Sequence, residues 1–247
     1  GMAVRKHNNE RRVNNSFKLT YKIKNIIFLF LIILVLYNFT FFKLIDFAST
    51  SASHGREDRA MDIIKFSNKY YPISPHGFEV EGEYYHSLYR ETKSIGDLGR
   101  AISLYEKALT LAPFDGGIHN KLGNMYLEAG DLVKAEEHLG LGADYGAYNI
   151  NRYLDLGLFY LNEDRIDDAE QVFLRGAELK DYAIRSASAE DRDSMVINAL
   201  TLHAMLYNIY KSSGQEEDLS RQIDELNLMM EEHEFLKEYF NMEIFID

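Results

Sequence analysis

The sequence of 247 residues contains no cysteine. This absence excludes disulfide bonds, thiolate metal sites and an anchor on a lipidated cysteine, but it does not fix the compartment. Proline is scarce, with 3 residues, and glycine occurs 16 times. Because 46% of the residues are apolar, the chain can build a core, and its composition is that of a folded protein rather than a disordered one.

Catalytic motifs are also missing from the sequence. There is no glycine-rich phosphate loop, no H-E-x-x-H and no G-x-S-x-G. The eight histidines are scattered. His119 and His138 bracket one predicted hairpin, yet no carboxylate has ligand spacing to both, so we interpret them as packing or surface residues. Acidic clusters such as Glu136-Glu137 are typical of solvated helix faces. We therefore predict no catalytic residue, no metal site and no cofactor.

Charge is distributed unevenly along the chain. Residues 1–49 carry eight Lys or Arg and two acids, whereas the remaining residues carry 19 Lys or Arg and 37 acids, which gives +6 and −18. A region so acidic repels phosphate backbones, so we predict that the protein does not bind nucleic acid. Residues 1–25 form a basic, Asn-rich tail, which we expect to be solvated or to lie near anionic lipid.

One long apolar run, Ile26–Phe42, reads IIFLFLIILVLYNFTFF. Its length suits a membrane span, which needs about 17–25 residues, if the helix continues to residue 46. The alternative is a buried core helix, but a helix that is apolar on every face does not suit a thin helical-hairpin array. We therefore predict a transmembrane helix over 26–46.

The flanking charges predict the orientation of this span. Seven Lys or Arg precede it, and only Arg56, Arg59 and Lys65 follow within about 20 residues. The tail is therefore expected in the cytoplasm and the rest of the chain outside it, at a bacterial inner membrane. A cleaved signal peptide is the alternative; an uncleaved signal anchor fits better because the apolar run exceeds about 7–15 residues. Small polar residues over 47–57 predict a linker.

A helical-hairpin pattern occurs twice between Lys121 and Phe173 with a period of 34 residues. Each copy has a turn before its alanine and a large apolar residue, Leu139 or Phe173, four positions after it. A 34-residue period with small residues at fixed offsets is typical of a two-helix solenoid unit. Four residues of the first copy recur in the second, which are Leu122, Gly123, Tyr126 and Ala135, and then Leu156, Gly157, Tyr160 and Ala169.

These residues resemble the tetratricopeptide repeat. The resemblance implies an all-α solenoid of helical hairpins over 58–236, preceded here by one transmembrane helix. We expect units at 79–113, 116–149 and 150–183, then helices at 195–211 and 216–233. Residues 60–72 read as the second helix of an incomplete first hairpin, whose partner is missing or is the membrane helix itself. Residues 237–247 are expected to cap the array.

The resemblance also implies a concave groove lined by the first helix of each hairpin. Asparagine could hydrogen-bond an extended peptide backbone there, and leucine could offer an apolar pocket. The plainer alternative is that these are exposed polar residues. The family's carboxylate clamp is not supported, because leucine occupies its positions in the third unit. By position, the groove residues are His86, Arg90, Asn120, Asn124, Asn151, Leu154, Leu158 and Asn162.

Two functions fit these features. The first is an adaptor or scaffold, anchored in the bilayer by 26–46, that holds a partner protein, as a peptide or a helix, in the groove during envelope assembly, secretion, pilus formation or polysaccharide export. The second is a structural subunit of a larger membrane complex, in which Asn38 and Thr40 hydrogen-bond to other spans.

Overall fold

A computed structural model describes residues 2–53, 57–146, 148–233 and 235, and the side chains within the first helix from Lys22 to Ala48 and at Thr50. Every regular element in these ranges is an α-helix, as the fold prediction required. The chain divides into two compact units, Gly1–Glu81 and Gly82–Asp247, here called unit 1 and unit 2. Helix α3 (Pro75–Thr92) runs through the boundary between them.

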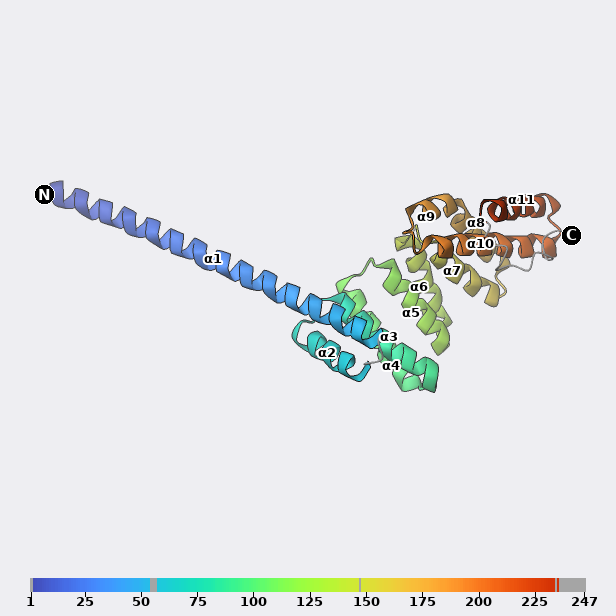
Figure 1. The fold of residues 1–247 in the computed structure, drawn as a ribbon, viewed down its shortest axis with the longest axis horizontal. Helices are drawn as coiled ribbons and strands as arrows, with labels where there is room; N and C mark the ends of the chain where they lie inside the picture. Colours follow the sequence, from blue (N-terminus) through green and yellow to red (C-terminus); the bar gives the residue numbers. More distant parts are fainter. Residues whose placement is uncertain (1, 54–56, 147, 234, 236–247) are drawn as a thin grey trace. The chain divides into compact units, whose positions relative to one another are not determined.

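Unit 1 consists of α1 (Met2–Ser53), α2 (Glu57–Tyr70) and the first residues of α3 (Figure 1). Within α1, Lys22–Ala48 is long and apolar enough to cross a membrane, and none of its most apolar stretch is buried. A core helix would be buried, so that interpretation does not hold for this segment. A signal sequence near the N-terminus would meet the same criteria of length and composition.

The expected linker over 47–57 differs from what the structure describes. Helix α1 continues to Ser53, and α2 begins at Glu57. The physical reason is packing, because Ile45 and Ala48 are fully buried in unit 1, and the apolar side chains of α2 at Ala60 and Ile64 are fully buried as well. The C-terminal part of α1 is thus the helix that pairs with α2, one of the two alternatives raised by the sequence.

Two polar side chains of α1 already have partners inside unit 1. Asn38 donates through Nδ2 to the carbonyl of Leu34 at 2.7 Å, and its Oδ1 accepts a hydrogen bond from the Tyr71 hydroxyl. Thr40 donates to the carbonyl of Leu36 at 2.7 Å. The Thr40 hydroxyl proton and one of the two amide N–H groups of Asn38 are thus already used within unit 1, which leaves the second Asn38 N–H for the interhelical hydrogen bonds of the structural-subunit hypothesis.

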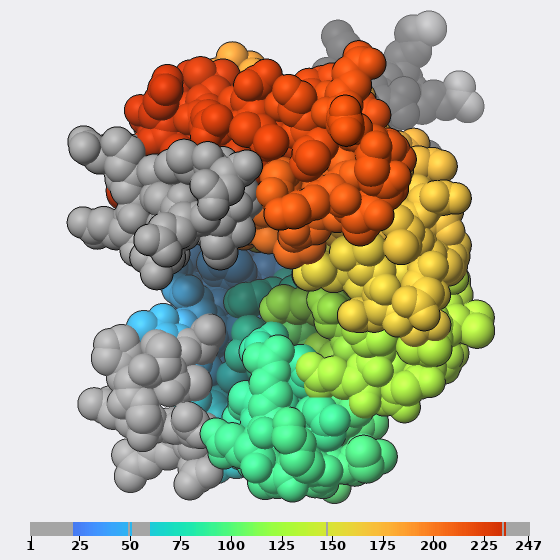
Figure 2. Space-filling view, turned by 90° about the vertical axis from the view of Figure 1, so that its right-hand side faces the viewer, coloured from blue at the N-terminus to red at the C-terminus, as the bar shows by residue number. Residues whose placement is uncertain are grey.

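Unit 2 repeats a helix–turn–helix element. Its helices are the rest of α3, α4 (Ile95–Leu111), α5 (Gly116–Ala129), α6 (Leu132–Tyr145), α7 (Ile150–Asn162), α8 (Ile166–Glu178), α9 (Lys180–Ser186), α10 (Arg192–Ser213) and α11 (Glu216–Glu232). The pairs α5–α6 and α7–α8 are the two hairpins of the 34-residue pattern. Figure 2 follows these segments in chain order from green through yellow to red.

The glycines of the repeat allow the two helices of a hairpin to approach closely. A Cβ on Gly123 would lie 2.7 Å from the Leu139 side chain, and one on Gly157 would lie 2.2 Å from the Phe173 ring. Both large residues are fully buried. Only glycine therefore leaves room for the ring or branched chain opposite.

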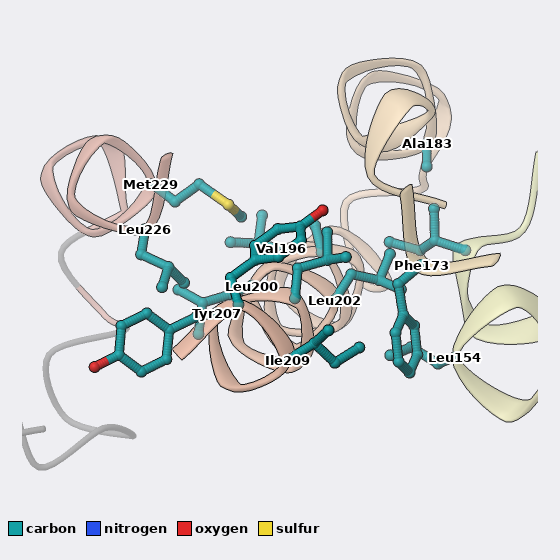
Figure 3. Packing of buried hydrophobic residues seen from close by; sticks show 14 of the residues in the cluster. Leu154, Phe173, Ala183, Val196, Leu200, Leu202, Tyr207, Ile209, Leu226 and Met229 are labelled. Carbon is teal, nitrogen blue, oxygen red and sulfur yellow. The ribbon is translucent and has the colours of Figure 1, made fainter. Parts of the chain in front are cut away.

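The largest described core surrounds α10. Its buried side chains pack toward α7, α8 and α9 on one side and toward α11 on the other (Figure 3). The short helix α9 lies between α8 and α10 in the chain, and its Ala183 is buried in this core. The expected cap at 237–247 lies outside the described residues.

Candidate binding groove

Three helices of unit 2, α5, α7 and α10, line a groove of about 440 Å³. The groove lies entirely within unit 2 and takes its floor and walls from one face of each helix. Its lining residues are Gly117, Asn120, Lys121, Asn149, Asn151, Arg152, Leu154, Asp155, Leu158, Asn198 and Thr201.

The spacing of these residues explains why they share a face. On α7 the lining residues Asn151, Leu154, Asp155 and Leu158 follow the i, i+3, i+4, i+7 pattern, which is one stripe of an α-helix. On α5 the equivalent stripe, 34 residues earlier, starts at Gly117. The repeat therefore places corresponding positions of two hairpins side by side along the groove.

The N-terminal ends of α5 and α7 are fixed by equivalent caps. The Asp115 carboxylate accepts hydrogen bonds from the backbone N–H groups of Gly117 and Ile118 at 2.8 and 3.2 Å. Asn149, 34 residues later, accepts one from the N–H of Asn151 at 3.1 Å. Such caps satisfy otherwise free N–H groups, so they set where each lining stripe begins.

Polar side chains in and beside the groove bond to one another across the helices. Asn124 donates to Asp155 at 3.3 Å and joins α5 to α7. Asn198 of α10 donates to the Oδ1 of Asn151 at 2.5 Å and joins α10 to α7. These bonds hold the walls at a fixed separation, which reduces the entropy lost when a ligand binds.

The positive charge of Lys121, on the wall of the groove, is neutralised by the carboxylate of Glu83. Its ammonium donates to Glu83 at 3.0 Å and to the Tyr105 hydroxyl at 3.2 Å, while that hydroxyl donates to Glu83 at 2.9 Å. Burial alone would raise the pKa of Glu83, but the charge and hydrogen bond of Lys121, with the bond from Tyr105, hold it below its ordinary value. Glu83 is therefore ionised at neutral pH.

Arg152 has no carboxylate partner within ion-pair distance among the described residues. Its guanidinium lies over Gly146 and Gly116, where a Cβ would fall 1.1 Å and 2.4 Å from Nη1, and it donates to the carbonyl of Gly142 at 3.4 Å. Burial lowers the pKa of Arg152, and the charge of Asp115 opposes this only in part. Arginine nevertheless keeps its charge, so the groove holds a cation that no carboxylate pairs directly among the described residues.

Asn120 has an unsatisfied donor. Its side-chain Nδ2 is buried and has no hydrogen-bond partner in the described structure. Helix α6 approaches this residue closely, since a Cβ on Gly142 would lie 3.1 Å from the Cβ and the backbone N of Asn120. If the Asn120 side chain turns toward the groove that it lines, this donor can pair with an incoming carbonyl or carboxylate, which would recover the cost of leaving it unpaired.

The predicted groove residues fall into two groups. Asn120, Asn151, Leu154 and Leu158 line the groove, and Asn124 contacts the lining residue Asp155. The other three do not line it. They are His86, which is buried with its Nε2 3.0 Å from Glu128, and Arg90 and Asn162, which are exposed elsewhere.

Sequence reasoning did not identify several lining residues. Lys121 and Asp155 are 34 residues apart on the same stripes as the predicted residues, so the helical spacing could have found them. Arg152 lies beside this stripe, and only the three glycines around its guanidinium allow it to bend into the groove. Asn198 and Thr201 come from α10, outside the recognisable repeat, and no local signal marks them.

His119 and His138 pack against each other, with ring centroids 5.2 Å apart. The His119 Nε2 donates to the Pro113 carbonyl at 3.1 Å, so its Nδ1 accepts from the Nδ1–H of His138 at 3.0 Å. Burial first, and then the neighbouring His119, lower the pKa of His138. Within the described ranges, no group of three or more His, Asp or Glu is placed to hold a metal ion.

Comparisons with known proteins agree with this architecture. Two family models, both described as tetratricopeptide repeat, match residues 91–115 and 104–137. One crystal structure of MamA has a TM-score of 0.57 at 16% identity and covers 83% of this chain and 97% of that one. A second has a TM-score of 0.56 at 17% identity, with 75% and 95% covered. At these identities the likeness concerns the fold.

A curated relative matches only a short segment. The BBSome complex member BBS4 of Bos taurus is 39% identical over 62 residues, which are 25% of this chain and 12% of that protein. The match thus spans about an eighth of the relative's length.

Proposed function

We propose that this chain, which is a tetratricopeptide-repeat protein, is a non-enzymatic adaptor that holds an extended segment of a partner protein in the groove of unit 2. The observation that carries the proposal is the groove itself. It combines a buried, unpaired amide donor at Asn120, an arginine without a carboxylate partner at Arg152, and the leucines Leu154 and Leu158.

The chemistry of this groove suits a polypeptide. Side-chain amides can donate to backbone carbonyls, and the leucines can cover an apolar side chain of the partner. Leu158 is 39% exposed and Leu154 only 7%, so Leu158 is the better placed of the two to meet a ligand. Arg152 would attract a carboxylate of the same segment.

We further propose that Lys22–Ala48 anchors the adaptor as a single membrane span, with the basic tail in the cytoplasm and the acidic unit 2 on the other side of an inner membrane. The exposed apolar side chains of this segment and the excess of basic residues before it support the anchor and its direction. A periplasm-active reporter fused to the C-terminus is expected to be active. A reporter active only in the cytoplasm would exclude this orientation.

The experiment that tests the groove is cross-linked co-purification of the full chain from native membranes. The variants are Asn120→Ala/Asn124→Ala and Arg152→Gln, and the matched control is Asn208→Ala/Gln171→Ala, which truncates two exposed side chains that do not line the groove. We expect a stoichiometric partner that is lost in both groove variants and kept in the control. A partner kept in all variants would place the interface elsewhere.

A span exchange separates an anchor from a structural subunit. Residues 26–36 are replaced by an unrelated apolar sequence, while Tyr37, Asn38 and Phe41 are kept because they bond or stack within unit 1. An adaptor tolerates this exchange and still binds its partner, whereas a subunit whose span packs on other spans loses its assembly.

A further inference from the structure

In the α1–α2 hairpin of unit 1, the end of α2 lies beside the apolar segment of α1. The chain reverses after α1, and α2 runs back along it, so that the end of α2 contacts α1 well before the end of its apolar stretch. The Tyr37 hydroxyl donates to the Tyr70 carbonyl at 2.6 Å, and the Phe41 and Tyr71 rings stack with centroids 5.2 Å apart. Both Tyr37 and Phe41 belong to the candidate span.

We propose that the end of α2 and the turn after it lie at the boundary between headgroups and acyl chains of the bilayer that α1 crosses, with Phe66, Tyr70 and Ile73 in contact with lipid. Unit 1 would then hold the membrane at two places, by a span and by an interfacial helix end. The inference rests on the proposed anchor, and its partner is the lipid interface.

The length of the span sets the depth of this helix end. Lys24 and Lys43 bracket the uncharged part of α1, and at 1.5 Å per residue they are about 29 Å apart, close to the 30 Å of a hydrocarbon core. The second boundary therefore lies near Lys43. Phe41 and Tyr37 then lie about 3 and 9 Å inside that boundary. Because Tyr70 and Tyr71 contact them directly, these residues must reach the same depth.

The side chains at this helix end suit the interface. Phe66 is 52% exposed, Tyr70 51% and Ile73 62%. Lys69 extends over the Tyr70 ring at 5.3 Å, so an ammonium and an aromatic face are presented together. Exposed aromatic residues with a neighbouring lysine are typical of the boundary between headgroups and acyl chains, where the ring is partly buried and the charge reaches water.

Several polar groups at this level are paired within unit 1, which lowers the cost of lipid contact. The Tyr70 carbonyl, at the end of α2, accepts from Tyr37, and the Asn38 amide bonds to the Leu34 carbonyl and the Tyr71 hydroxyl. The Thr40 hydroxyl donates to the Leu36 carbonyl. A group left unpaired here could not hydrogen-bond to water once the surface entered the membrane.

The test uses single cysteines, because the natural chain has none. The full-length variants are Ile73→Cys at the proposed contact, Val35→Cys within the span and Asp62→Cys on the exposed face of α2, about 12 Å along the helix from Tyr70. Each is reconstituted in phosphatidylcholine–phosphatidylglycerol vesicles and labelled with an environment-sensitive dye. Quenching by brominated lipid is then compared with quenching by aqueous iodide.

We expect brominated lipid to quench the labels at residues 73 and 35, and iodide to quench the label at residue 62 severalfold more strongly than the other two. If residue 73 behaves like residue 62 while residue 35 is quenched by lipid, the anchor stands and the interfacial contact is wrong. If neither quencher reaches the label at residue 73, protein covers this surface, and this result also overturns the inference. If iodide quenches residue 35, the anchor itself fails.

The dye could draw residue 73 into lipid by its own apolarity, so a second readout uses the unlabelled thiol. The reaction rate of Ile73→Cys with a charged maleimide is measured in vesicles and in detergent-free urea. A thiol at the lipid interface reacts severalfold more slowly than that of Asp62→Cys in vesicles and at the same rate in urea. Equal rates in vesicles would contradict the contact.

Discussion

The hairpins α5–α6 and α7–α8 are successive copies of one repeat, and their residues agree at some positions of the repeat but not at others. Their interior positions match, with Gly123 and Gly157 on the first helix and the fully buried Leu139 and Phe173 opposite. Their groove positions do not match, since asparagines on α5 correspond to Leu154 and Leu158 on α7. Stacking thus limits the residues between the helices, whereas the groove face is free to differ from one hairpin to the next.

The largest expected effect comes from truncating the residue opposite each glycine. Phe173→Ala is expected to lower the free energy of unfolding by about 3–5 kcal/mol and Leu139→Ala by about 2–5 kcal/mol, because each leaves a cavity in a fully buried site. Urea unfolding of the full chain in detergent micelles, followed by circular dichroism, measures both. A loss under about 1 kcal/mol at either position would contradict the packing described here.

Filling the glycine positions should have a smaller effect of the same sign. Gly157→Ala places a methyl group against the Phe173 ring, and Gly123→Ala places one 2.9 Å from the backbone N of Leu139. Overpacking of this kind costs about 1–3 kcal/mol. Gly140→Ala is the matched control, because a Cβ there meets nothing within 4 Å; it is expected to be neutral or stabilising.

The sequence predicted the hairpins well because their signal is local and repeated. Glycine, alanine and large apolar residues at fixed offsets specify which faces meet, and α10 and α11 followed from helical spacing. The groove was predicted only in part. His86 occupies a groove position of the repeat but is turned into a bond with Glu128, and Arg152 enters the groove only because glycines surround it. Such outcomes depend on contacts between hairpins, which spacing along one helix does not encode.

The two hairpins can also be compared at the turn between their helices. Gly130 ends α5 with φ at 79°, and Asp164, its equivalent 34 residues later, has φ at 57°. Both angles are in the left-handed region, which costs a residue with a Cβ about 1–2 kcal/mol. Gly130→Ala is therefore expected to destabilise the chain by about 1 kcal/mol, whereas Asp164→Gly should be neutral or slightly stabilising. The same urea titration measures both, and equal losses would contradict the assignment.

The smallest expected effect is a pH dependence of stability that comes from the first hairpin and not from the second. His138 on α6 corresponds to Val172 on α8, so only the first hairpin has a titratable group there. Burial and His119 lower the pKa of His138, so the unfolded chain, with a pKa near 6.5, binds a proton at a higher pH than the folded one. Its contribution to stability is present above about pH 7 and is lost as the pH falls through 6.5 toward the lower folded pKa.

The variant His138→Val makes the two hairpins alike at this position. We expect its stability to fall less than that of the unmodified chain between about pH 7.5 and pH 5.5. Part of the decrease should remain, because burial also lowers the pKa of His203 in the core around α10. Urea unfolding at the two pH values, with Gly140→Ala as a variant that keeps all titratable groups, measures the difference. An identical decrease in His138→Val would show that the proton is taken up elsewhere, since valine cannot bind one.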